Sequence, residues 1–257
     1  MIFVKTHQYQ GVAWLQHLWK YSPSHVRGAL LADDMGLGKT LQLLTFILNC
    51  LEKDTHLEPV LIVAPVTLLE NWQAELHKFF EATHLTVLVL YGDELKSKRA
   101  HKKQIDEQLQ QNGLVKFLQP NWLGNARIVL TTYETLRDLE FSFAAQKWSI
   151  MVCDEAQKIK NPNALMTRAA KKQNVRFKIA CTGTPVENSL TDLWCLFDFI
   201  QSGLLGALNE FRTCYSRPIE AKTDEEKARV DGLRQLIEPQ TLRRTKADVA
   251  KDLPKKI

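Results

Sequence analysis

Residues 31–42, LADDMGLGKTLQ, combine two closely spaced glycines with a lysine and a threonine. Gly36 and Gly38 would let backbone N–H groups close around phosphate oxygens, because no side chain stands in the way. Lys39 would then place its positive charge on the β- and γ-phosphates, and the hydroxyl of Thr40 would bind a magnesium ion. A strand-like run precedes the stretch and a helical pattern follows it, which is the context that such a loop requires. We therefore expect a nucleoside triphosphate to bind here.

Hydrolysis of a bound triphosphate needs a second carboxylate to hold the metal, and residues 148–157, WSIMVCDEAQ, supply one. Asp154 is placed to bind magnesium directly or through water, and Glu155 can then polarise the attacking water. Two acidic residues after a strand can also be merely solvated, but the phosphate loop upstream favours the catalytic role. A tetrapeptide typical of guanine recognition, TKAD at 245–248, follows a charged LRR segment instead of a buried strand. We expect a surface helix there and favour ATP over GTP.

The elements that must position these residues are short apolar runs separated by helical patterns. Continuous apolar runs are typical of strands covered on both faces, and they occur at 28–33, 60–65, 85–91, 127–133, 148–155 and 178–184. Helical periodicity marks 40–52 and 67–80. The alternation predicts an α/β fold with a mainly parallel sheet between two helical layers, and a ligand site at the carboxyl ends of the strands. After about residue 205 the chain is charged and helix-biased, so we expect a lobe at 1–205 and a helical protrusion at 206–257.

Composition excludes several other classes of protein. The chain has 257 residues, 45% of them hydrophobic, which is enough for a substantial core. No apolar run approaches the length of a membrane span, and the first ten residues do not resemble an export signal. Five cysteines without a C-x-x-C pair and seven histidines without metal-ligand spacing argue against disulfides and zinc and favour a reducing compartment. The net charge of +5 suits a polyanionic partner without requiring one.

Six motifs in order resemble those of the SWI/SNF-type ATPases, which are helicase-like, DNA-translocating motors of superfamily two. They are ADDMGLGKT, LIVAPVTLLENWQAEL, VLTTYETLR, DEAQKIKN, TGTPVENSLTDLW and LRRTKADV, and the resemblance covers residues 7–254. It implies the N-terminal RecA-like lobe of a motor that uses ATP and Mg²⁺ and acts on double-stranded DNA. It also explains Asp33, which stands where the general pattern has its first glycine, because the family's loop, D-x-G-x-G-K-T, does not require that glycine.

The resemblance assigns further residues to sites. It places the nucleotide contacts at Asp34, Met35, Gly36, Leu37, Gly38, Lys39 and Thr40, with Gln10 as the candidate for adenine recognition. It places contacts to the DNA backbone at Pro65, Thr67, Leu68, Thr131, Thr132, Lys158, Lys160 and Asn161. It places the coupling of nucleotide state to DNA at Thr182, Gly183, Thr184 and Pro185. Gln10 and the DNA-contact candidates have simpler alternatives, which are an exposed helical glutamine, ordinary turn and helix-capping residues, and solvated lysines.

Two departures from the family matter for function. Gln157 stands where many members have histidine, so any coupling role for it must use hydrogen bonds and not a change of charge. The sequence contains no second set of alternating strand and helix patterns. We therefore expect it to be half of a two-lobed motor and to be nearly inactive alone. The alternatives are a strand-separating helicase of the same superfamily and a non-enzymatic module that binds nucleotide or DNA. The expected location is the cytoplasm, on the nucleoid if the source is bacterial, or the nucleus if it is eukaryotic.

Overall fold

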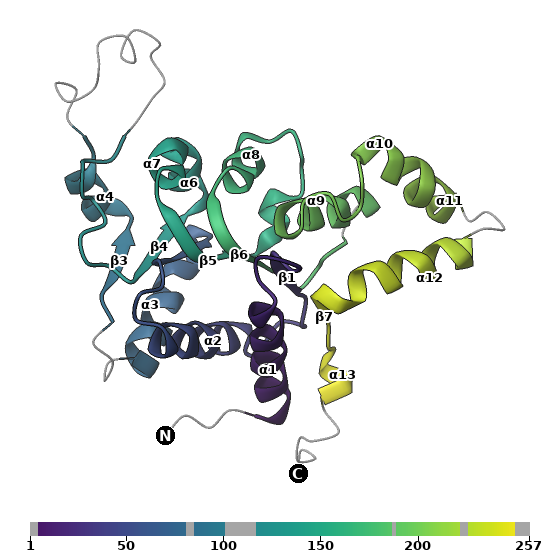
Figure 1. Cartoon of the computed structure of the whole chain (residues 1–257), viewed down its shortest axis with the longest axis horizontal. Coiled ribbons are helices and arrows are strands. Elements are labelled where there is room, and N and C mark those ends of the chain that lie inside the picture. The colour runs from purple at the N-terminus through teal and green to yellow at the C-terminus, as the bar shows by residue number, and fades with distance from the viewer. Residues whose placement is uncertain (1–4, 81–84, 101–116, 187–188, 222–225, 250–257) are drawn as a thin grey trace, which may run out of the picture.

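A seven-stranded sheet forms the centre of the computed structural model, which describes residues 5–80, 85–100, 117–186, 189–221 and 226–249 (Figure 1). The strand order is β3-β4-β2-β5-β6-β1-β7, and every pairing in this sheet is parallel. The strands are β1 Gly28–Leu31, β2 Val60–Ala64, β3 Val87–Leu90, β4 Ile128–Thr132, β5 Lys147–Asp154, β6 Asn174–Cys181 and β7 Thr241–Leu242. The first six lie where the apolar runs predict strands.

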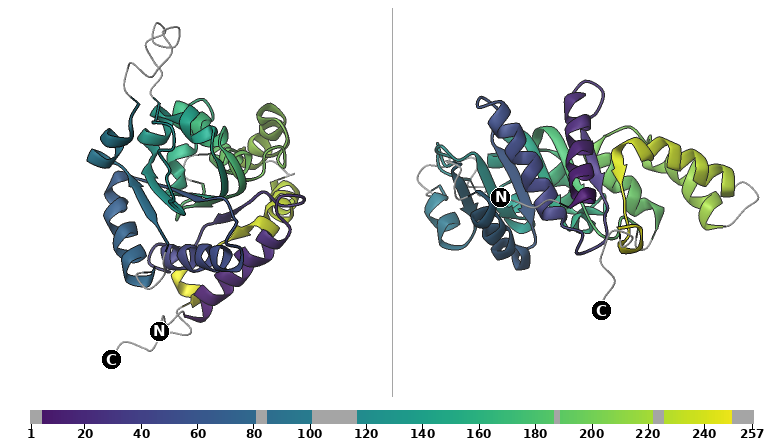
Figure 2. Two further views of the ribbon diagram at one scale, coloured as in Figure 1. Left: turned by 60° about the vertical axis from the view of Figure 1, so that its left-hand side comes forward. Right: turned by 90° about the horizontal axis from the view of Figure 1, so that it is seen from below.

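Both faces of the sheet are covered by helices, which explains why its central strands are apolar throughout (Figures 1 and 2). Leu61 and Val63 of β2 belong to one core, and Ile62 between them belongs to the other. The second of these cores is closed by α1 Thr6–Lys20, α2 Lys39–Lys53 and α3 Val66–Phe80. The first is closed by α4 Gly92–Lys98, α6 Tyr133–Asp138, α7 Glu140–Ala144, α8 Leu165–Lys171 and α9 Leu190–Ile200. The predicted three-layer α/β fold is confirmed.

A helical protrusion extends to one side of the sheet after α9 (Figure 2). It consists of α10 Leu208–Phe211, the π-helical turn η3 Arg212–Ser216, α11 Arg217–Glu220 and α12 Glu226–Ile237. The chain then returns through the short helix η4 Glu238–Gln240 to β7, which pairs with β1 at the edge of the sheet. The strand β7 was not expected after residue 205, because its two half-buried residues are too few to show the apolar run typical of a buried strand. Residues 250–257 of the expected protrusion lie outside the described residues, and the boundary at 205/206 stays a prediction.

The TKAD tetrapeptide leads into α13 Lys246–Val249, as expected, but it closely follows β7. Both residues of β7 are half-buried, so the tetrapeptide does not follow a buried strand, and the preference for ATP rests also on the family resemblance. Among the described helices, none is long and apolar enough to cross a lipid bilayer.

Candidate nucleotide-binding site

The predicted phosphate loop lies between β1 and α2, at the carboxyl end of β1. Gly36 and Gly38 have φ angles of 85° and 78°, in the left-handed region that favours glycine. A Cβ atom on Gly38 would lie 2.2 Å from Nε2 of Gln8, so a larger residue here would displace the end of that side chain. Gly38 is the N-cap of α2, whose first N–H groups have no partner within the helix. The loop thus presents backbone donors and a helix amino terminus to an anion.

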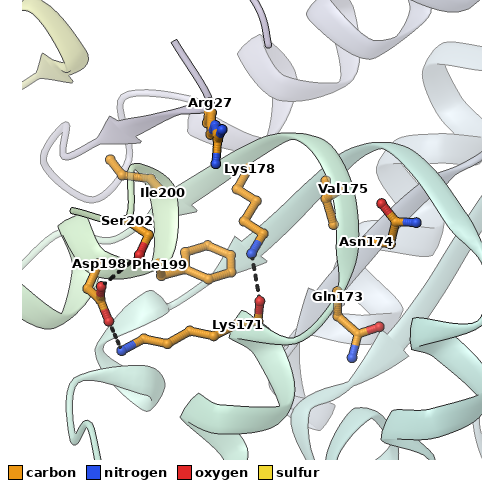
Figure 3. A pocket seen from close by; sticks show the side chains of 10 residues that line it. All are labelled: Arg27, Lys171, Gln173, Asn174, Val175, Lys178, Asp198, Phe199, Ile200 and Ser202. Atoms are coloured by element: carbon orange, nitrogen blue, oxygen red, sulfur yellow. Dashed lines mark hydrogen bonds and ion pairs between the residues drawn. The ribbon is translucent and has the colours of Figure 1, made fainter. Parts of the chain in front are cut away.

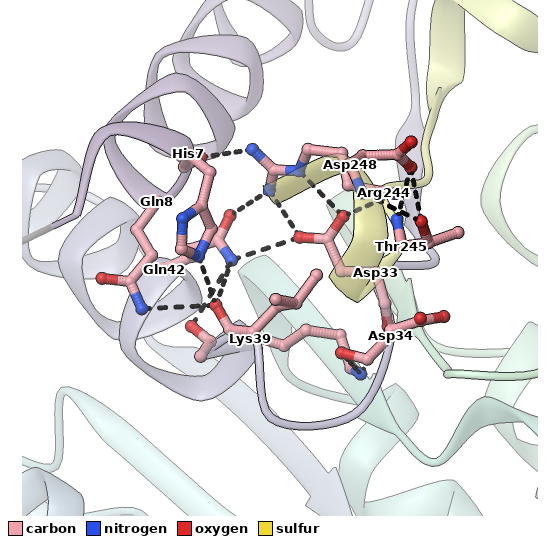
Figure 4. Close-up of polar contacts among 11 residues, drawn as sticks. His7, Gln8, Asp33, Asp34, Lys39, Gln42, Arg244, Thr245 and Asp248 are labelled. Atoms are coloured by element: carbon pink, nitrogen blue, oxygen red, sulfur yellow. Dashed lines mark hydrogen bonds and ion pairs between the residues drawn. The ribbon is translucent and has the colours of Figure 1, made fainter. Parts of the chain in front are cut away.

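Lys39 folds back over the loop (Figure 4). Its Nζ donates to the main-chain carbonyl oxygens of Asp33 and Asp34 at 2.7 and 3.4 Å. Phosphate oxygens would be stronger acceptors for this ammonium group than neutral carbonyls, because the hydrogen bond would then join two opposite charges. Thr40 follows in the first turn of α2 and is partly buried. The ammonium group of Lys39 therefore already lies at the loop that would bind the phosphates.

Asp154 ends β5 in the same row of the sheet as the start of the phosphate loop. In that row Leu31 of β1 pairs with Cys181 of β6, which pairs with Asp154. Neighbouring strands lie about 4.8 Å apart, so two strand spacings, about 10 Å, separate the ends of β1 and β5. The sheet therefore brings the loop and the carboxylate to one edge, as the sequence predicts.

Three donors hold Asp154 in place. Trp72 Nε1 donates to its Oδ2 at 2.8 Å, the Glu155 N–H donates to its Oδ1 at 3.0 Å, and the Tyr133 hydroxyl donates to its carbonyl oxygen at 2.7 Å. Asp154 is 8% exposed. Burial raises the pKa of its carboxyl above the ordinary value, the hydrogen bond from Trp72 lowers it, and the nearby charge of Glu155 raises it. A cation at this carboxylate would stabilise its ionised form.

Glu155 has a φ of 50°, unusual for a residue with a side chain. This conformation turns the chain from β5 into the short helix η2 Ala156–Ile159. Gln157 Nε2 donates to Glu155 Oε2 at 2.6 Å, and Gln157 Oε1 accepts from Thr182 Oγ1 at 2.8 Å. The Thr182 oxygen in turn accepts from the N–H of Thr184 at 3.1 Å. The hydrogen-bonding position predicted for Gln157 is thus present, and it links the water-polarising candidate to two of the coupling candidates.

The donor set at this edge fits magnesium better than a metal held wholly by the protein. Within the described ranges, no group of three or more His, Cys, Asp or Glu side chains could hold a metal ion. Magnesium is commonly bound by one or two protein oxygens together with waters and substrate phosphates. The hydroxyl of Thr40 and the carboxylate of Asp154 are oxygen donors of that kind.

The two glutamines at the start of α1, Gln8 and Gln10, differ in burial. Gln10 is exposed on α1, whereas His7 and Gln8 are buried. Gln8 Nε2 donates to the Leu37 carbonyl at 3.2 Å, and a ring nitrogen of His7 lies 3.1 Å from the same oxygen (Figure 4). Gln10 is thus accessible, whereas Gln8 is engaged with the loop, and the assignment of adenine recognition to Gln10 stays a prediction. Helical spacing could have shown that Gln8 is buried, because residue 8 falls on the buried stripe of Val12 and Leu15 whereas residue 10 does not.

The predicted DNA contacts divide into exposed and buried residues. Thr131 and Thr132 are 0% and 2% exposed. The Thr131 hydroxyl donates to the Leu90 carbonyl at 3.0 Å, and Thr132 caps α6 by accepting from the Thr135 N–H at 3.1 Å. Their side chains thus have internal roles, and the capping alternative holds for Thr132. Pro65, Thr67 and Leu68 lie at the junction of β2 and α3 and are partly or fully accessible.

The three DNA-contact candidates in and just after η2 differ in how they are engaged. Lys158 and Asn161 are exposed. Lys160 is half-buried, with its Nζ 4.0 Å from a carboxylate oxygen of Asp192. Only the first two present freely accessible polar side chains to a partner.

The coupling candidates border the phosphate loop. Thr182 is fully buried at the end of β6, and its N–H donates to the Leu31 carbonyl at 3.1 Å. A Cβ on Gly183 would lie 3.4 Å from the side chain of Met35, which is a loop residue and 60% exposed. Gly183 therefore lies beside the phosphate loop, and its role in coupling stays a prediction.

Asp33 has a partner that the sequence analysis missed. Its carboxylate is fully buried and forms an ion pair with Arg244, 211 residues later (Figure 4). Arg244 belongs to the segment 206–257, which we expected to form the protrusion. It instead follows β7 back to the loop, and nothing local in the sequence marks that return.

A separate cavity of about 270 Å³ lies at the opposite edge of the sheet, near the starts of β1 and β6 (Figure 3). Lys178 Nζ donates there to the Lys171 carbonyl at 3.0 Å and lies 5.1 Å from the ring centre of Phe199. Burial lowers the pKa of Lys178 to about 8. The Lys171 ammonium pairs with Asp198. These contacts serve the packing of β6 against α8 and α9.

The fold and the site define an α/β domain of the helicase-like kind, with a candidate phosphate loop and the buried carboxylate of Asp154 at one edge of a parallel sheet. The family model of the SNF2-related domain matches residues 7–257, and the chain belongs to that family. The predicted resemblance to SWI/SNF-type ATPases is confirmed.

Individual relatives agree with the family. The chain is 60% identical over 256 residues to Zorya protein ZorD of Escherichia coli O139:H28, and 38% identical over 256 residues to the putative ATP-dependent helicase/translocase YwqA of Bacillus subtilis. These matches cover 100% and 99% of this chain but 24% and 25% of the relatives. The chain thus spans about a quarter of the length of these relatives.

Solved structures agree as well. The Sulfolobus solfataricus SWI2/SNF2 ATPase core in complex with dsDNA matches with a TM-score of 0.78 and 34% identity. The match covers 100% of this chain and 48% of the archaeal one. The same core domain in another structure matches with a TM-score of 0.74. The RecA-like character of the lobe follows from this likeness.

Proposed function

We propose that this chain is the ATP-binding lobe of a DNA-dependent ATPase that moves along duplex DNA and thereby remodels protein–DNA complexes. The observation that carries the proposal is the meeting of Lys39, Asp154 and Glu155 at one edge of the sheet. Membership of the SNF2-related family and relatives named as helicases or translocases support it.

Each residue of the site has a role in the proposed reaction. Lys39 binds the β- and γ-phosphates within the backbone donors of the loop, and Thr40 and Asp154 hold the metal. A bound Mg²⁺ supplies charge neutralisation to the phosphates. Glu155 accepts a hydrogen bond from the attacking water and polarises it. We assign the contact on the adenine side to Gln8 in place of Gln10, because Gln8 is the glutamine of α1 that reaches the loop.

Duplex DNA is the proposed partner, since the archaeal relative was solved with dsDNA. The accessible candidates Pro65, Thr67, Leu68, Lys158 and Asn161 would contact the phosphate backbone, which carries no sequence information. Binding should then weaken steeply with salt, because released counterions supply much of its free energy. A competition assay with unrelated duplexes tests this, and a strong sequence preference would contradict backbone tracking.

Turnover in this proposal needs a second lobe. The solved core that this chain matches is about twice as long as the matched part. Charge that develops on the γ-phosphate requires donors beyond Lys39, and an inserted arginine is worth about a thousandfold or more in related phosphoryl transfers. We therefore expect residues 1–257 to bind ATP with almost no turnover, with or without DNA. Brisk DNA-stimulated hydrolysis by these residues alone would contradict the two-lobe proposal.

A strand-separating helicase of the same superfamily remains the second candidate, and an unwinding assay on the full-length protein distinguishes it from a duplex translocase. The third possibility, a non-enzymatic binding module, is disfavoured by the presence of both Lys39 and Glu155. All five cysteines are free thiols in the structure. We propose a reducing compartment, the cytoplasm, with the nucleoid or the nucleus as the place of action.

The decisive experiment measures ATP affinity by isothermal titration in the presence of Mg²⁺. Lys39→Ala should weaken binding severely, because the phosphates lose their only lysine partner in the loop. Lys53→Ala is the matched control, since Lys53 is an exposed lysine in the last turn of the same helix. Equal affinity of the two variants would show that the phosphate site is wrongly assigned.

A further inference from the structure

The Asp33 carboxylate is a buried negative charge at the base of the phosphate loop. Its side chain is 0% exposed, and that of Arg244 is 13% exposed. Arg244 Nε donates to Asp33 Oδ1 at 3.0 Å, and a second guanidinium nitrogen donates to Oδ2, which is a bidentate arrangement (Figure 4). The Arg244 main-chain N–H also donates to Oδ1 at 3.1 Å. Paired groups with this geometry are the usual way in which a carboxylate is kept charged inside a protein.

Arg244 binds other parts of the nucleotide site as well. One of its nitrogens donates to the His7 carbonyl at the start of α1, and another donates to Gln42 Oε1 of α2 at 2.9 Å. Gln42 Nε2 donates back to Asp33 Oδ2 at 3.3 Å. A single guanidinium group therefore joins the end of β1 to both helices that flank the loop.

The chain after β7 runs along the loop itself. The N–H of Ala32 donates to the Leu242 carbonyl at 2.7 Å, and the N–H of Asp34 donates to the Arg244 carbonyl at 3.0 Å. The N–H of Lys246 donates to Asp34 Oδ2 at 3.1 Å. These bonds fix the backbone that delivers Arg244 to Asp33.

Asp33 is also directly connected to the phosphate-binding lysine, because its carbonyl oxygen accepts the 2.7 Å hydrogen bond from Lys39 Nζ. A triphosphate bound to Lys39 would bring several negative charges close to the Asp33 carboxylate. Coulomb repulsion is strong where water is excluded, so an unpaired Asp33 would oppose binding. The loop can carry an acid at this position only if the charge is cancelled.

We propose that Arg244 is a positioning residue for phosphate binding, and that it acts by neutralising Asp33 beneath the loop. The inference rests on the proposed ATP site and concerns a residue that touches the loop and not the phosphates. It explains why the protein tolerates Asp33 where other phosphate loops have glycine. The distinguishing consequence is that loss of Arg244 should weaken binding in proportion to the charge of the ligand.

The experiment compares Mg-ATP, ADP and adenosine by isothermal titration on the full-length protein. Arg244→Gln should lower the affinity for ATP by about tenfold or more, the affinity for ADP by less, and that for adenosine hardly at all. The double variant Asp33→Asn/Arg244→Gln removes both charges and should restore ATP affinity to within about threefold of wild type. Arg243→Gln is the matched control, because Arg243 is the exposed neighbour.

A purely structural role of Arg244 predicts other results. Equal losses for all three ligands in Arg244→Gln, or no restoration by Asp33→Asn in the double variant, would overturn the inference. If Arg244→Gln does not fold, Asp33→Asn alone decides, since it should keep or increase ATP affinity, and a loss beyond about threefold would overturn the inference. Failure of the proposed function looks different, because wild-type protein and Lys39→Ala would then bind ATP equally.

Discussion

Gln157 and Thr182 are joined by a hydrogen bond of 2.8 Å between Thr182 Oγ1 and Gln157 Oε1. The other end of the same amide donates to Glu155 at 2.6 Å. A neutral amide can make both contacts at once because it has a donor and an acceptor. An imidazolium could not, because it has donors only. The amide therefore forms a fixed bridge between the residue proposed to polarise water and the motif after β6.

Removing the Gln157 amide should uncouple Glu155 from the motif after β6. In a protein that contains both lobes, Gln157→Ala should reduce DNA-stimulated ATP turnover by about tenfold, the worth of one to two hydrogen bonds. Turnover without DNA should change much less. Steady-state hydrolysis with and without duplex DNA measures the ratio, and Gln235→Ala on the exposed side of α12 is the control. An unchanged ratio in Gln157→Ala would refute the coupling role.

Binding and chemistry should separate at Glu155. Glu155→Gln keeps the size of the side chain and removes the charge that polarises water, so ATP should still bind. Turnover of the two-lobed protein should fall by about two to four orders of magnitude, the usual worth of a positioned base. Glu52→Gln on the exposed face of α2 should leave turnover unchanged. Normal turnover in Glu155→Gln would mean that another group activates the water.

The two glutamines of α1 should differ in their effect on nucleotide binding. Gln8→Glu keeps the oxygen that accepts from the Lys5 N–H and removes the amide donor that reaches the Leu37 carbonyl. It should weaken ATP binding by about threefold or more, because one hydrogen bond is lost and a negative charge is added beside the phosphate loop. Gln10→Glu, two residues away on the exposed face, makes the same chemical change and should have no effect. A loss confined to Gln10→Glu in isothermal titration would restore the assignment made from the sequence.

The stability of the protein should depend on pH through Lys178. Burial lowers the pKa of this group to about 8, against an ordinary value of 10.5, so the unfolded chain holds the proton more tightly between those two values. Lys178 therefore makes the free energy of unfolding rise as pH increases through that window, by at most about 3 kcal/mol. Buried thiols such as that of Cys153, whose pKa burial raises to about 12, act in the opposite direction.

The comparison of wild type with Lys178→Met isolates the lysine from these thiols. Urea unfolding at several pH values between 8 and 10 should show that the wild type gains stability relative to Lys178→Met as pH rises. A difference in unfolding free energy that is independent of pH would show that Lys178 is protonated equally in both states.

Local patterns in the sequence were enough to predict the sheet and the centre of the site. Buried strands in a parallel sheet must be apolar along their whole length, so six of them could be recognised, and a loop that wraps phosphate needs glycines where Gly36 and Gly38 stand. Because parallel strands end at a common edge, Asp154 could be placed beside that loop before any coordinates were known.

Only the tertiary structure decided the partners of those residues. Asp33 pairs with Arg244, 211 positions away, because β7 docks on β1, and a two-residue strand has no periodicity that could announce it. Thr132 caps a helix although its type and place at a strand end suited a phosphate contact equally well. Gln8 reaches the loop because packing against the sheet determines how α1 is rotated about its own axis. The chemistry of a side chain follows from its residue type alone. The pairing of charges that are distant in the sequence depends on which segments lie side by side, and the packing of the whole fold determines that.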